Sequence, residues 1–301
     1  MFHTQKNITM NNSKNNLVNN PNNVINQNSV ENIDWEGTLW RERIFSHPER
    51  TITIGTSCSG IGAPEQALRQ LGLNGKILFA GDIDPNVKKS YFANYDISEE
   101  QWHNDMFKFD ATPFKGKLTL FVAGICCQTF SKAGGLAGVK DKKRGCLYTA
   151  FSRIVRECEP EVWIMENVEN MLNSNRGSDW KIIKAELDTL GYDIHYQVLN
   201  AKNYGVPQSR ARLFVVGFKR PTEFLFPKPI KQEKVIYDIL ENTKEGLRQL
   251  TPREALRLQG FGEDFKIAVS DTYAYKQAGN SIAVPVLKAL YQQMDITKYG
   301  F

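Results

Sequence analysis

The stretch Thr-Ile-Thr-Ile-Gly-Thr-Ser-Cys-Ser-Gly-Ile-Gly-Ala, residues 51–63, decides the fold. Its first six residues are rich in β-branched side chains and predict a strand, and the small residues that follow predict a tight turn. A helix should run from Pro64 to Leu71, because Pro suits the first helical turn and Gly72 ends the pattern. The segment therefore opens as a strand, a glycine-rich turn and a helix.

Apolar and helical segments alternate in the same way as far as Phe218. Strands separated by helices of about 10 to 15 residues predict a mostly parallel sheet that is covered on both faces. We therefore expect an α/β fold with a doubly wound, Rossmann-like sheet, in which ligands bind beyond the carboxyl ends of the strands. The expected strands are residues 51–56, 76–80, 118–123, 162–165, 195–199 and 212–218, and the expected helices are 64–71, 147–158, 180–190, 252–258 and 282–294.

The composition indicates a globular protein with an anionic partner. The chain has 301 residues, 41% of them hydrophobic, and a net charge of +5. These values exclude a disulfide-stapled miniprotein and a wholly disordered chain. Residues 201–260 hold 12 basic and 6 acidic side chains, and the run from Lys132 to Arg144 holds five basic side chains against one acidic. Two concentrated basic regions favour a polyanion as the partner.

Cysteine use and hydropathy indicate where the chain works. Its five cysteines are odd in number and unevenly spaced, which favours a reducing compartment and matches no zinc pattern. We find no long apolar run and no signal-peptide pattern, so we expect a cytoplasmic protein with no membrane segment and no metal. Residues 1–33 contain 12 Asn, and residues 1–48 are expected to be a disordered tail and lead-in. A binding arm, an A/T-rich genome and a misplaced start codon are open explanations of this tail.

Asp82 follows the second expected strand, 20 residues past Gly62. An acidic group at that distance from a glycine-rich turn suits the hydroxyl groups of a ribose, although a turn that only packs a helix would look the same. The third Gly of the dinucleotide pattern is absent, because Pro64 and Glu65 already begin the helix. This departure favours S-adenosylmethionine over a nicotinamide cofactor.

Reactive side chains follow the next strands. Cys127 comes after the strand at 118–123 and beside a basic loop, where positive charge favours a thiolate; a small core residue is the alternative. Glu166 leaves an apolar strand, so burial should raise its pKa, which suits proton sharing with a ring nitrogen; a helix-capping acid is the alternative. Arg210 and Arg212 stand at alternate positions, so both could meet one anionic group.

Taken in this order, the residues closely resemble the motifs of the DNA (cytosine-5-)-methyltransferases, from about Thr51 to Pro285. The resemblance implies a class I S-adenosylmethionine-dependent methyltransferase fold. It also implies methyl transfer from S-adenosyl-L-methionine to carbon 5 of a cytosine flipped out of double-stranded DNA. The motifs are the turn at 58–62, Asp82, Asp105, Cys127-Gln128, Arg144-Gly145, Glu166-Asn167-Val168, Gln208-Ser209-Arg210-Ala211-Arg212, Leu250-Thr251-Pro252-Arg253-Glu254-Ala255 and Gln277-Ala278-Gly279-Asn280-Ser281.

The resemblance assigns a role to each matching residue. Cys127 would add to carbon 6 of the ring, Glu166 would contact nitrogen 3 and the exocyclic amine, and Asn167 would hold the loop. Arg212, with Arg210, would orient the base and a phosphate or carbonyl oxygen. Gln128 and Ser131 complete the expected catalytic group, and the expected cofactor-binding residues are Cys58, Gly60, Ile61, Gly62, Asp82, Ile83, Asp105, Met106, Gly124, Leu147, Asn280 and Ser281.

The chain departs from the family in three places. Cys126 stands where the family has Pro, and Thr56-Ser57-Cys58 replaces the usual Asp-Leu-Phe, which removes an aromatic ring that would stack on adenine. The expected catalytic domain covers residues 49–217 and 248–301, which leaves 218–247 as a much reduced target-recognition region. Recognition is then short and relaxed, or it is supplied by the tail or by a second protein.

Several functions remain open from the sequence. The leading one is a stand-alone or restriction-associated DNA methyltransferase of microbial or phage type. The same chemistry on RNA is an alternative, and so is a nucleic-acid-binding subunit that keeps the fold but needs a partner. Cys127, Glu166 and Arg212 are all present, which argues against a purely degenerate chain. A nicotinamide-dependent dehydrogenase would not need the Cys-Gln or Glu-Asn-Val motifs.

Overall fold

A computed structural model describes residues 40–125, 147–231, 236–240 and 248–301. Three of the predicted features lie outside these residues. They are the expected catalytic residues Cys127, Gln128 and Ser131, the basic run Lys132 to Arg144, and the tail as far as residue 39. The lead-in at 40–48 does not stand apart from the domain. Trp40 is buried in the main core, and the Arg43 guanidinium donates a hydrogen bond of 2.9 Å to the carbonyl oxygen of Gln293.

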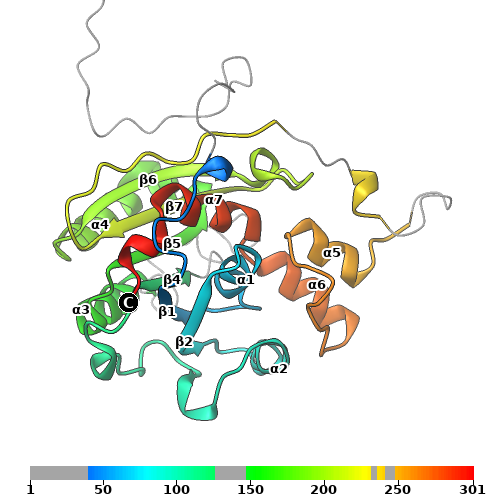
Figure 1. The fold of residues 1–301 in the computed structure, drawn as a ribbon, viewed down its shortest axis with the longest axis horizontal. Coiled ribbons are helices and arrows are strands. Elements are labelled where there is room, and N and C mark those ends of the chain that lie inside the picture. The colour runs from blue at the N-terminus through cyan, green and yellow to red at the C-terminus, as the bar shows by residue number, and fades with distance from the viewer. Residues whose placement is uncertain (1–39, 126–146, 232–235, 241–247) are drawn as a thin grey trace, which may run out of the picture.

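A seven-stranded sheet in the order β3-β2-β1-β4-β5-β7-β6 forms the centre of the molecule (Figure 1). Every neighbouring pair from β3 to β5 is parallel, and β7 runs antiparallel to both β5 and β6. The mostly parallel, Rossmann-like sheet predicted from the sequence is confirmed. The strands are β1 (Thr51–Ser57), β2 (Asn74–Gly81), β3 (Trp102–His103), β4 (Leu120–Gly124), β5 (Val162–Val168), β6 (Asp193–Asn200) and β7 (Ala211–Phe218).

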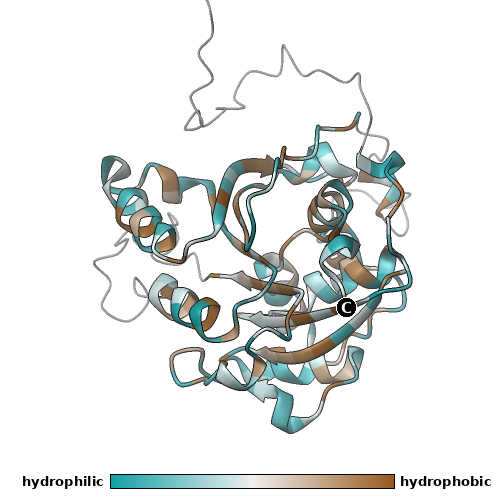
Figure 2. Ribbon diagram, turned by 60° about the vertical axis from the view of Figure 1, so that its left-hand side comes forward, coloured by the Kyte–Doolittle hydropathy of each residue, from teal (hydrophilic) through white to brown (hydrophobic). Residues whose placement is uncertain are grey.

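Helices cover both faces of the sheet, because alternate residues of its central strands point to opposite sides. Ile164 of β5 belongs to one core cluster, which also contains residues of α1 and α7. Its neighbours Trp163 and Met165 belong to a second cluster, which contains residues of α3 and α4. Figure 2 shows the apolar colour concentrated on the strands and on the sides of helices that face them. The helices are α1 (Ala63–Gln70), α2 (Pro85–Asn94), α3 (Leu147–Cys158), α4 (Ser178–Asp188), α5 (Pro252–Leu258), α6 (Asp271–Asn280) and α7 (Val284–Met294).

The expected helices at 147–158 and 252–258 match α3 and α5 at both ends. The strand expected to stop at residue 165 instead continues to Val168, because its pairing with β7 extends to Val168 opposite Arg212. Helices α2 and α6 and the short strand β3 were not predicted. In the described part of the chain, no helix combines the length and the apolar character needed to span a bilayer.

The carboxyl-terminal segment is part of the same domain as the first strand. The main-chain N–H of Thr51 donates to the carbonyl oxygen of Phe301 at 2.9 Å, and the reciprocal bond is 3.1 Å. Core residues of α7, among them Leu287 and Tyr291, share a cluster with Ala67 of α1. The chain therefore returns to β1 before it ends, and this return carries Asn280 and Ser281 to the start of α1.

Gly217 gives a test of this packing. It lies opposite Trp163 in the β5–β7 pair, and a Cβ atom at Gly217 would overlap the buried Trp163 ring. Gly217→Ala should lower the free energy of unfolding by about 2–3 kcal/mol, as expected for overpacking. Gly279→Ala is the control, since its Cβ would meet no atom within 4 Å and helix α6 should gain up to about 1 kcal/mol. Urea unfolding of both variants measures the difference, and equal stability of the two would contradict this packing.

Candidate active site

A pocket opens at the carboxyl ends of β1 and β4, where α1 begins and the α6–α7 connection closes over it. Five of the residues expected to bind the cofactor line this pocket: Cys58, Gly60, Gly124, Asn280 and Ser281. Because β1, β4 and the connection are far apart in sequence, their meeting here is a property of the sheet order. The other lining residues are Thr56, Ser57, Ser59, Ala63, Pro64, Val122 and Ile282.

The turn at 58–62 needs small residues because of its backbone conformation. Cys58, Gly60 and Gly62 have φ angles of 50°, 52° and 78°, in the left-handed region. A Cβ at Gly60 would meet no atom within 4 Å, whereas one at Gly62 would overlap the ring of Tyr95. The side chain of Ile61 is buried in the main core. Gly60 thus faces the pocket, while Ile61 and Gly62 do not line it.

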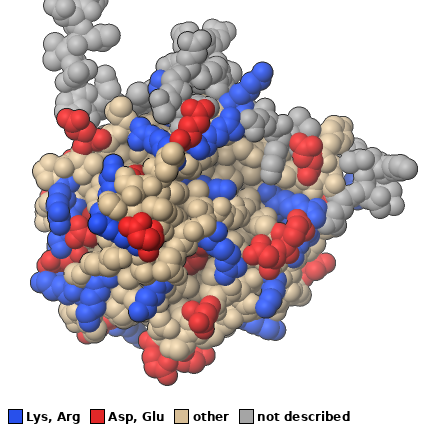
Figure 3. Space-filling model, in the orientation of Figure 1, with Lys and Arg blue, Asp and Glu red and all other residues tan. Residues whose placement is uncertain are grey.

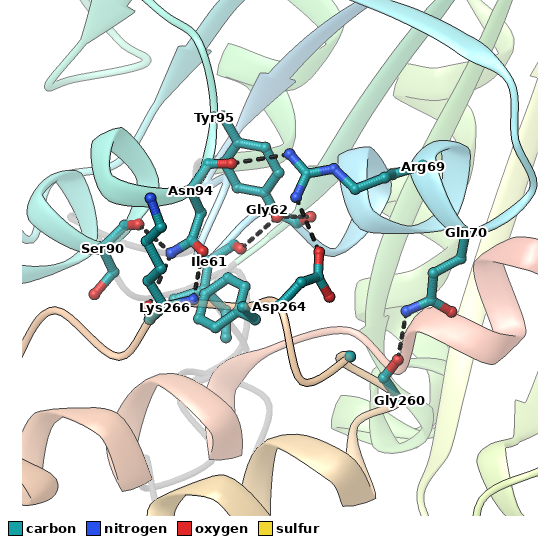
Figure 4. Close-up of polar contacts among 12 residues, drawn as sticks. Ile61, Gly62, Arg69, Gln70, Ser90, Asn94, Tyr95, Gly260, Asp264 and Lys266 are labelled. Atoms are coloured by element: carbon teal, nitrogen blue, oxygen red, sulfur yellow. Dashed lines mark hydrogen bonds and ion pairs between the residues drawn. The ribbon is translucent and has the colours of Figure 1, made fainter.

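Tyr95 holds the back of this turn (Figure 4). Its hydroxyl lies 2.7 Å from the carbonyl oxygen of Gly62 and 3.0 Å from that of Ile61. The Arg69 guanidinium lies 5.2 Å from the centre of the Tyr95 ring and donates to the carbonyl oxygen of Asn94 at 2.9 Å. The turn is therefore supported by side chains from both α1 and α2.

The same two helices bind the loop that follows α5. Asn94 donates to the carbonyl oxygen of Lys266 at 2.9 Å and accepts from its main-chain N–H at 2.7 Å. Gln70 donates to the carbonyl oxygen of Gly260 at 2.8 Å, and Arg69 pairs with Asp264 at 3.4 Å. These contacts join the turn of the pocket to the loop ahead of α6 (Figure 4).

Asp82 closes the turn from the side of β2. Its Oδ2 atom accepts the N–H of Gly60 at 3.1 Å, and its Oδ1 atom accepts the N–H of Asp84 at 3.0 Å. Burial raises the pKa of Asp82, and these hydrogen bonds partly oppose the shift. Ile83 is 82% exposed beside it. Asp82, which we expect to bind the ribose, thus contacts the glycine-rich turn, which we expect to bind another part of the cofactor.

The residues around Asp105 are not part of the pocket wall. Asp105 accepts the N–H of Phe107 at 2.9 Å, and Met106 is buried with its sulfur 3.7 Å from the Cys58 thiol. Leu147 packs at the edge of the second core cluster. None of Asp105, Met106 or Leu147 is among the residues that line the pocket.

His103 was not singled out from the sequence, and it supports Ser57 on the pocket wall. Its Nε2 atom lies 3.0 Å from the Ser57 hydroxyl, and its ring stacks on Phe109 with the centroids 4.2 Å apart. Burial lowers the pKa of His103 to about 4, so the ring is neutral near pH 7. A lone histidine outside any motif gave no signal for this role.

Glu166 forms the acidic centre beside the pocket. Its Oε1 atom lies 3.2 Å from Nε of Arg212, and a Cβ at Gly124 would lie 3.7 Å from its other oxygen. Burial raises the pKa of Glu166, while the positive charges of Arg212 and Arg210 oppose the shift. The rise expected from the sequence is confirmed. The residue that follows Gly124, Ile125, donates its N–H to the carbonyl oxygen of Glu166 at 3.1 Å.

The two arginines make different hydrogen bonds, although the positive charges of both act on the Glu166 carboxyl. Arg212 pairs with Glu166, but Arg210 donates to the carbonyl oxygens of Gly279 and Ser281 at 3.0 and 2.8 Å. Arg210 precedes the first residue of β7, so strand alternation does not fix its direction. It instead holds the α6–α7 connection. Asn167 is buried, and its Oδ1 atom accepts the N–H of Val168 at 2.8 Å.

The basic excess of residues 201–260 is reduced by acids from outside that interval. Lys219 pairs with Glu159 at 3.4 Å and Arg220 with Glu161 at 3.8 Å. Glu263 pairs with Arg257 at 2.6 Å. The face drawn in Figure 3 accordingly shows basic and acidic groups interspersed rather than one unbroken basic area. Charge counted along the sequence therefore overstates the positive surface here.

Arg212→Met tests the pair at the acidic centre. Loss of the guanidinium should raise the pKa of Glu166 further, and ionisation of the carboxyl then costs stability as the pH rises through that value. We expect a loss of about 3 kcal/mol at pH 8 and a smaller loss at pH 5, because protonation of the carboxyl at lower pH removes the unpaired charge. Urea unfolding at both values measures it. When Arg212→Met is added to Glu166→Gln, the loss of stability should be the same at pH 5 and pH 8. If Arg212→Met alone loses equal stability at both pH values, the pair with Glu166 is not the cause of the loss.

Comparison with known proteins agrees with this geometry. The model of the family described as C-5 cytosine-specific DNA methylase matches residues 52–246 and 231–295. The type II methyltransferase M.SsoII of Shigella sonnei is 32% identical over 304 aligned positions, which cover 79% of each chain. M.HpaII of Haemophilus parainfluenzae is 28% identical, over 88% of this chain and 95% of its own.

Solved structures show the same fold at low identity. The Dnmt2 methyltransferase of S. pombe superposes with a TM-score of 0.66 at 20% identity, over 81% of this chain and 98% of its own. A putative DNA modification methyltransferase encoded within an E. coli prophage gives 0.61 at 19% identity, over 80% of this chain and 99% of its own. The fold, the order of the motifs and the matched family model together show that this chain belongs to the C-5 cytosine-specific DNA methylase family.

Proposed function

We propose that the chain transfers a methyl group from S-adenosyl-L-methionine to carbon 5 of cytosine in DNA. The observation that carries this proposal is the acidic centre: a buried carboxyl with a raised pKa, paired with Arg212, beside the pocket at the end of β4. Cys127 follows β4 by three residues in the sequence. A proton-sharing acid on β5 and a cysteine that follows β4 in the sequence suit chemistry on a pyrimidine ring.

The pocket suits S-adenosylmethionine in the chemistry of its groups. Gly60 leaves the turn open to the ligand. Asp82 is not among the lining residues, but its carboxylate bonds the Gly60 N–H and can accept hydrogen bonds from two ribose hydroxyls of a ligand that extends past Gly60. Asn280 and Ser281 supply polar groups on the opposite wall. When bound here, S-adenosylmethionine supplies an electrophilic methyl group. We also assign to the surroundings of this ligand Cys58, Gly124, Ile83, Asp105, Met106 and Leu147. Of the last three, Met106 contacts the pocket wall through the Cys58 thiol.

The chain's own residues would make carbon 5 reactive. The Cys127 thiolate bonds to carbon 6 of the ring, and nitrogen 3 takes a proton from Glu166 as electron density moves to carbon 5. After methylation, a base removes the proton on carbon 5, the double bond re-forms and the thiolate leaves. Glu166 then recovers its proton. The raised pKa of Glu166 favours the protonated form relative to an exposed glutamate.

The remaining catalytic assignments follow from position. Arg212 would hold the Glu166 side chain in place, and Arg210 would hold the connection that carries Asn280 and Ser281. Asn167, Gln128 and Ser131 would order the segment around Cys127. A cytosine inside a duplex cannot reach these groups, so the base must leave the helix. Residues 218–247 would serve as a short recognition region on a catalytic domain formed by 49–217 and 248–301.

The experiment that tests the function is mass spectrometry of nucleosides from a methylation-free host that expresses this chain. We expect 5-methyldeoxycytidine in the DNA with the native chain and none with Cys127→Ser, since serine is a far weaker nucleophile than a thiolate. Methylation of RNA alone would move the substrate to RNA. Methylation of neither, with folded protein present, would show that the chain does not act by itself.

Asp82→Ala tests the ribose assignment. Loss of two hydrogen bonds to a charged acceptor should raise the dissociation constant for S-adenosylmethionine by about tenfold or more. Isothermal titration calorimetry of the purified protein measures this constant. Asp110→Ala is the matched control, because Asp110 is exposed and bonds only the neighbouring Thr112 among the contacts seen. An unchanged constant in Asp82→Ala would remove Asp82 from the cofactor site.

A further inference from the structure

A line of buried hydrogen bonds runs from helix α2 into the turn of the pocket. The Tyr91 hydroxyl donates to Oε1 of Glu65 at 2.6 Å, and the Thr56 hydroxyl donates to the same oxygen at 3.1 Å. The hydroxyls of Thr56 and Ser59 lie 2.7 Å apart, and Ser59 accepts the N–H of Gly81 at 2.8 Å. All five residues are buried.

The Thr56 and Ser59 hydroxyls each have one hydrogen, and three contacts share these two hydrogens. Thr56 donates to Glu65, Ser59 donates to the carbonyl oxygen of Gly81 at 3.0 Å, and either hydroxyl can donate in the contact between them. Ser59 also accepts the N–H of Gly81. The line therefore links Glu65 to both main-chain groups of Gly81, and neighbouring hydrogen bonds in such a line strengthen each other.

The line connects to the groups assigned to the cofactor. Ser59 lies between Cys58 and Gly60 in the turn, and Gly81 directly precedes Asp82. The Ser59 N–H also donates to the carbonyl oxygen of Gly81 at 2.9 Å. The bonds between Ser59 and Gly81 therefore hold the turn close to the end of β2. Next to them, the Gly60 N–H donates to the Asp82 carboxylate at 3.1 Å.

Glu65 itself lies away from the pocket and is not among its lining residues. Its other oxygen, Oε2, is buried without a hydrogen-bond partner in the described part of the chain, and burial raises its pKa. An unpaired buried oxygen carries a desolvation penalty, which offsets part of the gain from the two hydrogen bonds at Oε1. Packing alone therefore does not account for a glutamate here.

We propose that Glu65 is a positioning residue for cofactor binding, which acts through Thr56 and Ser59 to hold the glycine-rich turn against Asp82. The proposal rests on the proposed use of S-adenosylmethionine. Glu65 touches no substrate and takes no part in the chemical step. Its loss should loosen the turn and weaken the ligand without changing the acidic centre at Glu166, which lies on β5.

The test compares variants of the full chain by calorimetric titration with S-adenosylmethionine. Glu65→Leu should weaken binding by about tenfold, and Glu65→Gln should restore it to within about threefold, since an amide oxygen accepts the same two bonds. Thr56→Val should weaken binding as Glu65→Leu does, while Thr56→Ser keeps the hydroxyl. The double variant Glu65→Leu/Thr56→Val should have a dissociation constant no higher than that of the weaker-binding single variant, because both substitutions interrupt the same line of hydrogen bonds.

Tyr291→Phe is the matched control for Tyr91→Phe. Tyr291 is also buried, and the charge of Glu65 acts on it, but its hydroxyl has no hydrogen-bond partner in the described residues. Removal of that hydroxyl should leave the dissociation constant unchanged, whereas removal of the Tyr91 hydroxyl should raise it. KM for S-adenosylmethionine should follow the dissociation constant, while kcat and KM for DNA stay near the native values.

The outcomes separate this inference from the proposed function. If the native chain binds no S-adenosylmethionine, the proposed function fails and the inference fails with it. If the native chain binds and Glu65→Leu binds equally well, only the inference is overturned. Parallel loss of kcat and of affinity for both substrates would show general unfolding and also overturn it. Should Glu65→Leu not fold, the comparison of Tyr91→Phe with Tyr291→Phe decides, because Tyr91 does not line the pocket and its hydroxyl bonds Glu65.

Discussion

The register of the antiparallel pair β5–β7 fixes the acidic centre, and the rest of the site is arranged around it. Glu166 stands opposite Phe214, and Val168 stands opposite Arg212. Glu166 and Arg212 are therefore diagonal neighbours on one face of the sheet, a separation that a long arginine side chain can span. A slip of one residue would turn Arg212 to the other face and leave the carboxyl buried without its partner. The strand pairing thus sets the electrostatics of the site.

The central sheet and half of the pocket could be predicted because both follow from local patterns. Apolar runs mark buried strands, and the order of strands and helices places Cys58, Gly60 and Gly124 at one edge. The extension of β5 to Val168 could not be predicted in this way. Glu166 and Asn167 are polar and interrupt the apolar run, and only their pairing with β7 keeps them in the strand.

Three other differences have their own causes. Helix α2 did have a signal, since Asp84 caps it and Pro85 fills its first turn, but its weak apolar face did not predict a helix. The direction of Arg210 had no local signal, because it depends on carbonyl oxygens about 70 residues further along the chain. The charge of residues 201–260 is a related case, since its neutralising acids Glu159, Glu161 and Glu263 lie outside the interval that was counted. The contacts of Arg210, Lys219 and Arg220 depend on partners that are distant in sequence.

The loop that follows α5 is held in a way that bears on how the protein can change over evolutionary time. Gln70 and Asn94 bind main-chain atoms of Gly260 and Lys266 rather than their side chains. Every residue type offers a carbonyl group, so most substitutions at Lys266 would keep the contact, whereas a substitution of Asn94 would remove it. Sequence drift should therefore be tolerated in the held loop and resisted in the helices that hold it. The path that carries Asn280 to the pocket can thus persist while much of the loop sequence is replaced.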